Sequence, residues 1–157
     1  MEDFAEHELR HSITDADSPA WHTRAAAGRR LAAAPHIEGV AAVLHRRLLD
    51  TKDTGVTSDT AAALLARKDL AGLRAVLAAR ATASDEATAD QLAAELDCDP
   101  RWTAQEDDAE LITQLRTLTT DTAPEIRAEA QLRLSRLPGL HGQPRHQEIA
   151  IDEITAR

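Results

Sequence analysis

A helical spacing of small and apolar side chains recurs four times along this chain. In each copy three residues stand at positions i, i+4 and i+8, so that they share one face of an α-helix. The copies are Thr23, Ala27 and Leu31; Val56, Thr60 and Leu64; Thr88, Leu92 and Leu96; and Ile126, Ala130 and Leu134. Their first residues lie 33, 32 and 38 positions apart. A period in the thirties with helical spacing inside each unit is typical of a stacked array of helices.

The composition favours an all-α fold. Apolar residues make up 43% of the 157 residues and are mostly Ala and Leu, whereas aromatic residues make up only 2%. Such side chains let helices approach closely, and the scarcity of β-branched and aromatic residues disfavours a sheet. We expect a single domain over 1–157, with repeats over about 18–138, an N-terminal cap over 1–17 and a C-terminal tail over 139–157.

Turn and capping signals divide the chain into helices joined by short links. Ser18-Pro19 predicts a helix start with Ser18 as the N-cap, and Asp69 and Asp85 are placed to begin two later helices. Short links make neighbouring helices antiparallel. The expected A helices are about 37–50, 70–81 and 104–119, and the expected B helices are about 19–34, 56–67, 85–97 and 123–137.

Two stretches resemble the HEAT-repeat family in its short bacterial form. The family has an A helix that ends in a Leu-Leu-like pair, then Asp, a short turn, and a B helix with Ala and Leu spaced by four. Leu48-Leu49-Asp50 is followed in this way by Val56, Thr60 and Leu64, and Leu118 by Asp121, Ile126-Arg127, Ala130 and Leu134. The resemblance implies an α-α superhelix, a HEAT-like or armadillo-like solenoid of about four antiparallel helix pairs. It implies protein binding along the B-helix face and no particular activity.

The same resemblance implies a ladder of polar contacts between repeats. In the family, a loop Asp and a B-helix Arg resemble the rungs of this ladder. Asp17 with Arg24, and Asp121 with Arg127, occupy these positions. Thr57 and Ala89 stand where Arg is expected in the second and third units, so the ladder is expected to be interrupted there.

Negative charge is concentrated in one stretch. Between Asp85 and Glu110 ten acidic residues stand against one base, Arg101, which accounts for the whole net charge of −9, and the rest of the chain is balanced. Such a surface repels nucleic acid and attracts a basic protein. We expect partner binding, with Trp102 as an aromatic anchor. The residues expected to contact the partner are Asp97, Asp99, Trp102, Glu106, Asp107, Asp108 and Glu110.

The alternative for this acidic stretch is a solvated surface. Asp85, Glu86 and Glu106 stand in first helical turns, where acids complement the helix dipole. Trp102 could then fill a gap between helix layers rather than contact a partner.

Neither catalysis nor metal or cofactor binding is predicted. His7-Glu8 resembles the His-Glu pairs of HEAT-like di-iron hydroxylases, but the chain has a single adjacent pair. Asp97-Cys98-Asp99 begins like a calcium loop, yet Arg101 and Trp102 stand where such a loop needs an oxygen ligand and glycine. The enzymatic alternative is a metal site assembled from His7, His11, His36 and nearby acids.

The expected role is therefore protein recognition in the cytoplasm. Cys98 is the only cysteine, the acidic N-terminus lacks an apolar signal segment, and no apolar run is long enough to span a membrane. The most specific expectation is an immunity-type inhibitor that covers a basic partner protein. The alternative is an adaptor or scaffold that binds through its concave apolar face.

Overall fold

The structure, a computed structural model, describes residues 2–99 and 108–137. These residues are all-helical and contain no strand, which confirms the predicted all-α class for this part of the chain. The elements are α1 (Glu2–Asp15), α2 (Trp21–Ala32), the 3-10 turn η1 (Glu38–Val40), α3 (Ala41–Leu48), α4 (Thr54–Ala66), α5 (Leu70–Thr82), α6 (Glu86–Asp97), α7 (Asp108–Leu118) and α8 (Pro124–Arg136). The expected C-terminal tail, 139–157, lies outside the described residues.

Aspartate side chains begin three of the helices. Asp69 Oδ1 accepts a hydrogen bond from the Gly72 backbone N–H at 2.8 Å, and an Asp85 carboxylate oxygen accepts from the Thr88 N–H at 2.9 Å. Asp53 caps α4 in the same way. Each contact satisfies a backbone donor that has no partner within its helix. The expectation for Ser18 was wrong: Ala20 is the N-cap of α2, and Ser18 Oγ accepts a hydrogen bond from the N–H of Ala20.

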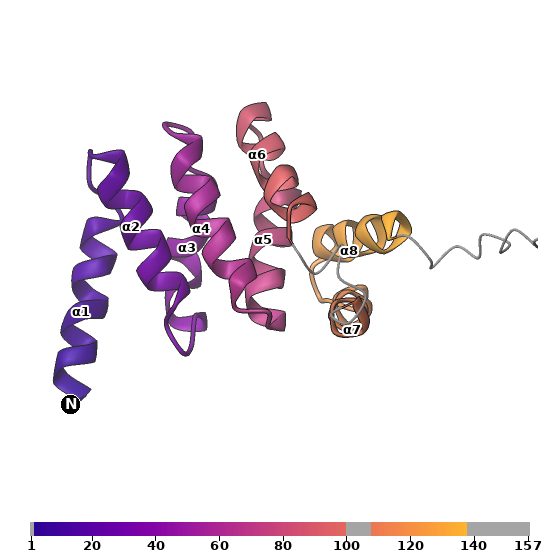
Figure 1. Ribbon diagram of the computed structural model, residues 1–157, viewed down its shortest axis with the longest axis horizontal. Helices are drawn as coiled ribbons and strands as arrows, with labels where there is room; N and C mark the ends of the chain where they lie inside the picture. The colour runs from indigo at the N-terminus through magenta and orange to yellow at the C-terminus, as the bar shows by residue number, and fades with distance from the viewer. Residues whose placement is uncertain (1, 100–107, 138–157) are drawn as a thin grey trace, which may run out of the picture.

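Helices α2 to α6 are stacked in two layers. α2, α4 and α6 pack side by side in one layer, and α3 and α5 pack on each other and on α4 behind it (Figure 1). α1 packs on α2 at the start of the row. The short α2–α3, α3–α4 and α4–α5 links hold consecutive helices together, as the pattern predicts.

The last helix pair leaves this arrangement. α8 packs on α5 and α7, whereas α6 packs on α4 and α5. In Figure 1, α8 lies across the view while α2, α4 and α6 run roughly vertically. Residues 100–107, between α6 and α7, lie outside the described residues. The expected fourth B helix therefore does not extend the layer of α2, α4 and α6.

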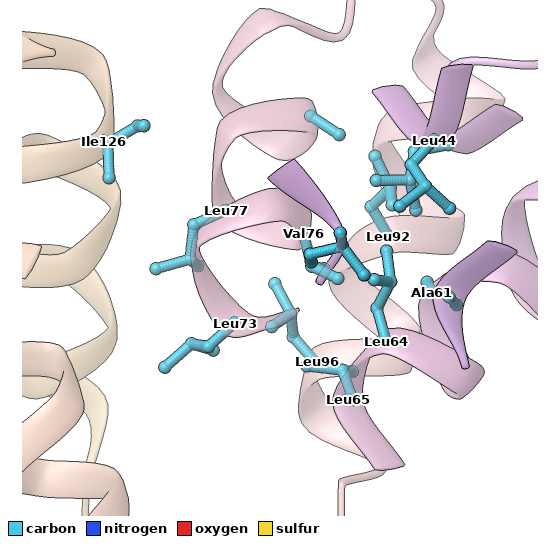
Figure 2. Packing of buried hydrophobic residues seen from close by; sticks show 14 of the residues in the cluster. Leu44, Ala61, Leu64, Leu65, Leu73, Val76, Leu77, Leu92, Leu96 and Ile126 are labelled. Carbon is cyan, nitrogen blue, oxygen red and sulfur yellow. The ribbon is translucent and has the colours of Figure 1, made fainter. Parts of the chain in front are cut away.

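One apolar core runs between the layers. Leu44, Leu64, Leu77 and Leu92 are completely buried and come from four different helices (Figure 2). The recurring template marks this buried face, because ten of its twelve residues are buried and Thr23 and Leu134 are half-buried. The i, i+4, i+8 spacing therefore predicts the core-facing side of each B helix correctly.

The link between α4 and α5 contains a strained residue, Lys68. Its φ of 57° is left-handed, a conformation that non-glycine residues adopt at a cost. Its carbonyl accepts a hydrogen bond from Gln114 Nε2 at 2.9 Å, so the turn also holds α7.

We expect Lys68→Gly to be more stable than Lys68→Ala by about 0.5–1 kcal/mol, because glycine removes the strain but also gains freedom in the unfolded chain. Both variants lose the lysine side chain, so their difference isolates the backbone. Urea unfolding measures the free energy of each. Equal stability of the two variants would show that the left-handed conformation carries no strain.

Candidate functional site

The exposed side of α6 carries an acidic face made of Glu86, Asp90 and Asp97. These three residues lie on the exposed side of the helix, opposite the buried Thr88 and Leu96. α6 contains no lysine or arginine, so no base within the helix neutralises them. We call Glu86, Asp90 and Asp97 the α6 acidic face.

The turn of the last helix pair leaves Glu86 and Asp90 of the α6 acidic face uncovered by any described helix, whereas Asp97 pairs with Arg133 of α8. Each of α2 and α4 is followed in its layer by another B helix, which packs on its flank. α8 packs on α5 and α7 instead, so α6 is the last described helix of this layer. A carboxylate-rich face at the edge of a layer is accessible to a partner.

Three of the seven predicted contact residues have described side chains. Asp97 is at the end of α6, where Oδ1 accepts a hydrogen bond from Arg133 Nη1 of α8 at 2.5 Å; the Asp97 side chain is 63% exposed. Glu110 of α7 is exposed and receives a hydrogen bond from Gln114 at 3.4 Å. Asp99 is buried, with only 7% of its surface exposed, so it does not belong to an exposed acidic surface.

The other predicted contacts are not placed by the structure. Trp102, Glu106 and Asp107 lie outside the described residues, and Asp108 is described only as the first residue of α7. Glu86 and Asp90 were not among the predicted contacts. Their i, i+4 spacing within the acidic stretch could have identified them, but not the fact that their helix stays uncovered.

Glu95 of α6 has a structural role. Its carboxylate accepts a hydrogen bond from the Ser58 hydroxyl of α4 and one from Gln91 Nε2 at 3.0 Å. Glu95 therefore joins α6 to α4, whereas Glu86 and Asp90 face solvent.

An apolar pocket lies beside the acidic face, between the C-terminal ends of α4 and α6. It has a volume of about 300 Å³. Ala62, Leu65 and Ala66 supply its apolar lining, and Lys68, Glu95, Cys98 and Asp99 complete it. This volume is at the lower end for ligand pockets and is large enough for one apolar side chain.

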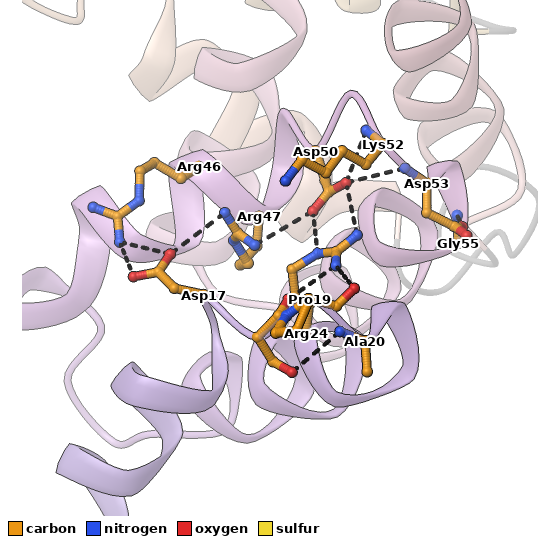
Figure 3. A network of polar contacts seen from close by, with 11 residues as sticks. Asp17, Pro19, Ala20, Arg24, Arg46, Arg47, Asp50, Lys52, Asp53 and Gly55 are labelled. Carbon is orange, nitrogen blue, oxygen red and sulfur yellow. Dashed lines mark hydrogen bonds and ion pairs between the residues drawn. The ribbon is translucent and has the colours of Figure 1, made fainter.

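A second polar cluster joins α2 to α3 and to the loop after α3 (Figure 3). Arg24 Nε donates to Asp50 Oδ2 at 2.8 Å, and both side chains are almost fully buried. Arg47 Nη1 reaches the same Oδ2 at 3.3 Å. The expected pairing of Asp17 with Arg24 was wrong, because Arg24 bonds the loop Asp of the next repeat and Asp17 contacts Arg46 and Arg47.

The second expected pair, Asp121 with Arg127, also differs from the expectation. Arg127 Nη1 donates to the backbone carbonyls of Asp121 and Thr122, as Arg24 Nη1 does to those of Ser18 and Pro19. The Asp121 carboxylate instead accepts two hydrogen bonds from Arg74 of α5, at 2.7 and 3.0 Å. Arg24 and Arg127 therefore each hold the loop before their own helix, while the loop aspartates Asp50 and Asp121 pair with arginines of the earlier helices α2 and α5.

These contacts shift the pKa values of both aspartates. Burial raises the pKa of Asp50, but the hydrogen bonds from Arg24 and from the backbone N–H of Asp53 and Lys52 outweigh it, so the pKa is below the usual range. The hydrogen bond from Arg74, with that from the Ala123 N–H, lowers the pKa of Asp121. Both carboxylates are stabilised in the ionised form.

The histidines considered for a metal site lie on separate elements. His7 and His11 are on α1, where His11 contacts Asp15 at 3.5 Å, and His36 is in the link before η1. Within residues 2–99 and 108–137, no three His, Cys, Asp or Glu side chains form a group that could hold a metal ion. None of the described helices combines the length and apolar character needed to cross a membrane.

Comparison with known proteins finds no relative: no protein-family model, curated protein or solved structure matches the chain.

Proposed function

We propose that the protein is a non-enzymatic recognition module, a short solenoid of the HEAT-repeat type, that binds a basic protein through the α6 acidic face. The stacking of α2, α4 and α6 over α3 and α5 supports the repeat assignment. So does the shared role of Arg24 and Arg127, which each bond the two carbonyls that precede their helix.

The observation that carries this proposal is the uncovered α6 acidic face. Glu86 and Asp90 are exposed, no base on α6 neutralises them, and no described helix packs over them. Opposite charge on a partner would accelerate encounter and fix orientation. An immunity-type inhibitor of a basic protein is the most specific form of this function.

The apolar pocket between α4 and α6 favours a second candidate, an adaptor that holds a partner by an apolar side chain. Ala62, Leu65 and Ala66 line the pocket, and apolar contacts are little affected by salt. The two candidates therefore differ in the salt dependence of binding.

We expect the double charge reversal Glu86→Lys/Asp90→Lys to weaken partner binding by at least about tenfold at low salt, because attraction becomes repulsion at the contact. The partner is captured from a lysate of the source organism on the immobilised protein, identified and purified. Its affinity is then measured at low and high salt by calorimetry.

Glu6→Lys/Glu8→Lys on α1 is the matched control. It changes the net charge by the same amount at exposed positions distant along the chain. This variant is expected to keep the affinity within about threefold. An equal loss of affinity in both double variants would show that the effect comes from net charge alone. Binding that is insensitive to salt and to both variants would favour the adaptor.

A further inference from the structure

A charged cleft of about 200 Å³ lies between the start of α2, the end of α3 and the loop after α3. Four cations and two carboxylates line it, so it carries excess positive charge on a protein whose net charge is −9. The charged residues are Arg24, Arg46, Arg47, Lys52, Asp17 and Asp50 (Figure 3).

The inner part of the cleft is fully committed to the fold. Arg24 donates to Asp50 and to the carbonyls of Ser18 and Pro19. Asp50 also accepts from the backbone N–H of Lys52 at 3.1 Å and of Asp53 at 3.0 Å. Arg24 and Asp50 therefore form a rigid base and have no capacity left for a ligand.

The outer part is held loosely. Arg46 Nη2 is 3.5 Å from both carboxylate oxygens of Asp17, and Arg47 Nη2 is 3.8 Å from Oδ1. Charge-assisted hydrogen bonds are about 2.7–2.9 Å long, so these contacts are weak. The Asp17 side chain is 62% exposed, which screens the attraction further.

The mouth of the cleft holds more hydrogen-bond donors than Asp17 accepts from. Arg46 contacts Asp17 through Nη2 alone, and Lys52 is exposed and forms no ion pair with a described residue. A guanidinium presents a planar fork that matches a carboxylate or phosphate group. Basic residues in the last turn of α3 also offset its dipole, but that effect does not involve Lys52, which lies beyond the helix.

We propose that this cleft binds an oxyanion, a phosphate or carboxylate group, which replaces Asp17 between Arg46, Arg47 and Lys52. The cleft is smaller than the pockets that hold drug-sized ligands, so the ligand is one small anionic group. The site is separate from the α6 acidic face and goes beyond the proposed function. Without the ligand, the Asp17 carboxylate occupies its place, so Asp17 competes with the ligand for these cations.

The test measures binding of inorganic phosphate and of succinate to the folded protein by calorimetry, at constant ionic strength in chloride. Arg46→Gln is expected to weaken binding at least about fivefold. Asp17→Asn is expected to tighten it several-fold, because the competing carboxylate loses its charge. The opposite signs of these two effects cannot come from a loss of folding.

Arg30→Gln is the matched control. Arg30 is 51% exposed and Arg46 is 52% exposed, and each pairs with an aspartate near the end of α1, Asp15 and Asp17 respectively. Arg30→Gln is expected to leave binding unchanged. Tighter binding of phosphate than of succinate would identify a phosphate group, and the reverse a carboxylate. No binding of either anion, equal loss in Arg30→Gln, or no gain in Asp17→Asn would overturn the proposal.

Discussion

Asp50→Ala is expected to lower the free energy of unfolding by about 3–5 kcal/mol. Asp50 accepts hydrogen bonds from Arg24 and Arg47 and from two backbone N–H groups. The side chains of Arg24 and Arg47 are only 5% and 11% exposed. Removing the carboxylate leaves two desolvated guanidinium groups without their shared counter-charge.

Urea unfolding at neutral pH measures this loss, and Asp59→Ala is its control. Asp59 of α4 also pairs with an arginine of α2, Arg29, but those side chains are 39% and 52% exposed. Removing an exposed pair is expected to change stability by less than about 1 kcal/mol. If Asp50→Ala does not fold, Asp50→Asn keeps a hydrogen-bond acceptor and is expected to show an intermediate loss. Similar effects of Asp50→Ala and Asp59→Ala would contradict the role of burial.

The pH dependence gives an independent check on Asp50. Its pKa in the folded state is below the usual value, so the ionised carboxylate stabilises the fold above the unfolded pKa of about 3.9. This contribution is lost as the pH falls through the folded-state pKa. We therefore expect the wild type to lose more stability than Asp50→Ala between about pH 5 and pH 3.

Gly28→Ala is expected to lower the free energy of unfolding by about 1–2 kcal/mol, although alanine favours helix over glycine by about 1 kcal/mol. A Cβ atom at Gly28 would lie 2.1 Å from Thr60 Oγ1 and 3.2 Å from Thr60 Cβ. Gly28 is on α2 and Thr60 on α4, so the added methyl group would force the two helices of one layer apart or displace Thr60.

Thr60→Ala is expected to rescue Gly28→Ala. The Thr60 hydroxyl is buried and has no hydrogen-bond partner among the described residues, so its removal makes space and eliminates an unsatisfied group. Thermal or urea unfolding of both single variants and the double variant gives the coupling between the sites. Gly39→Ala is the control, because a Cβ there meets no atom within 4 Å. If the changes in unfolding free energy of the two single variants simply add in the double variant, the added methyl group does not clash with Thr60.

Local spacing predicts the helices and their buried faces because both depend on neighbours in the chain. Asp69 and Asp85 begin helices as expected, since an N-cap needs only the backbone two or three residues ahead. Leu92 and Leu96 are buried because the i, i+4 spacing places them on one side. Ser18 failed as an N-cap because α2 starts three residues later, at Trp21.

Contacts between repeats could not be predicted in the same way. Arg24 has two candidate aspartates, Asp17 and Asp50, and the choice depends on how α2 meets the loop before α4. For the candidate site, the sequence indicates an acidic stretch but does not show that Asp99 is buried or that Glu86 and Asp90 remain accessible.

The amino-acid sequence by itself determined the helical class, the positions of the helices and the side that each B helix buries. Tertiary structure alone decided that α8 packs on α5, that Arg24 bonds Asp50 and that no described helix covers Glu86 and Asp90. The physical reason is the range of the forces involved. Helix formation and capping act over a few residues, whereas helix packing depends on which surfaces meet.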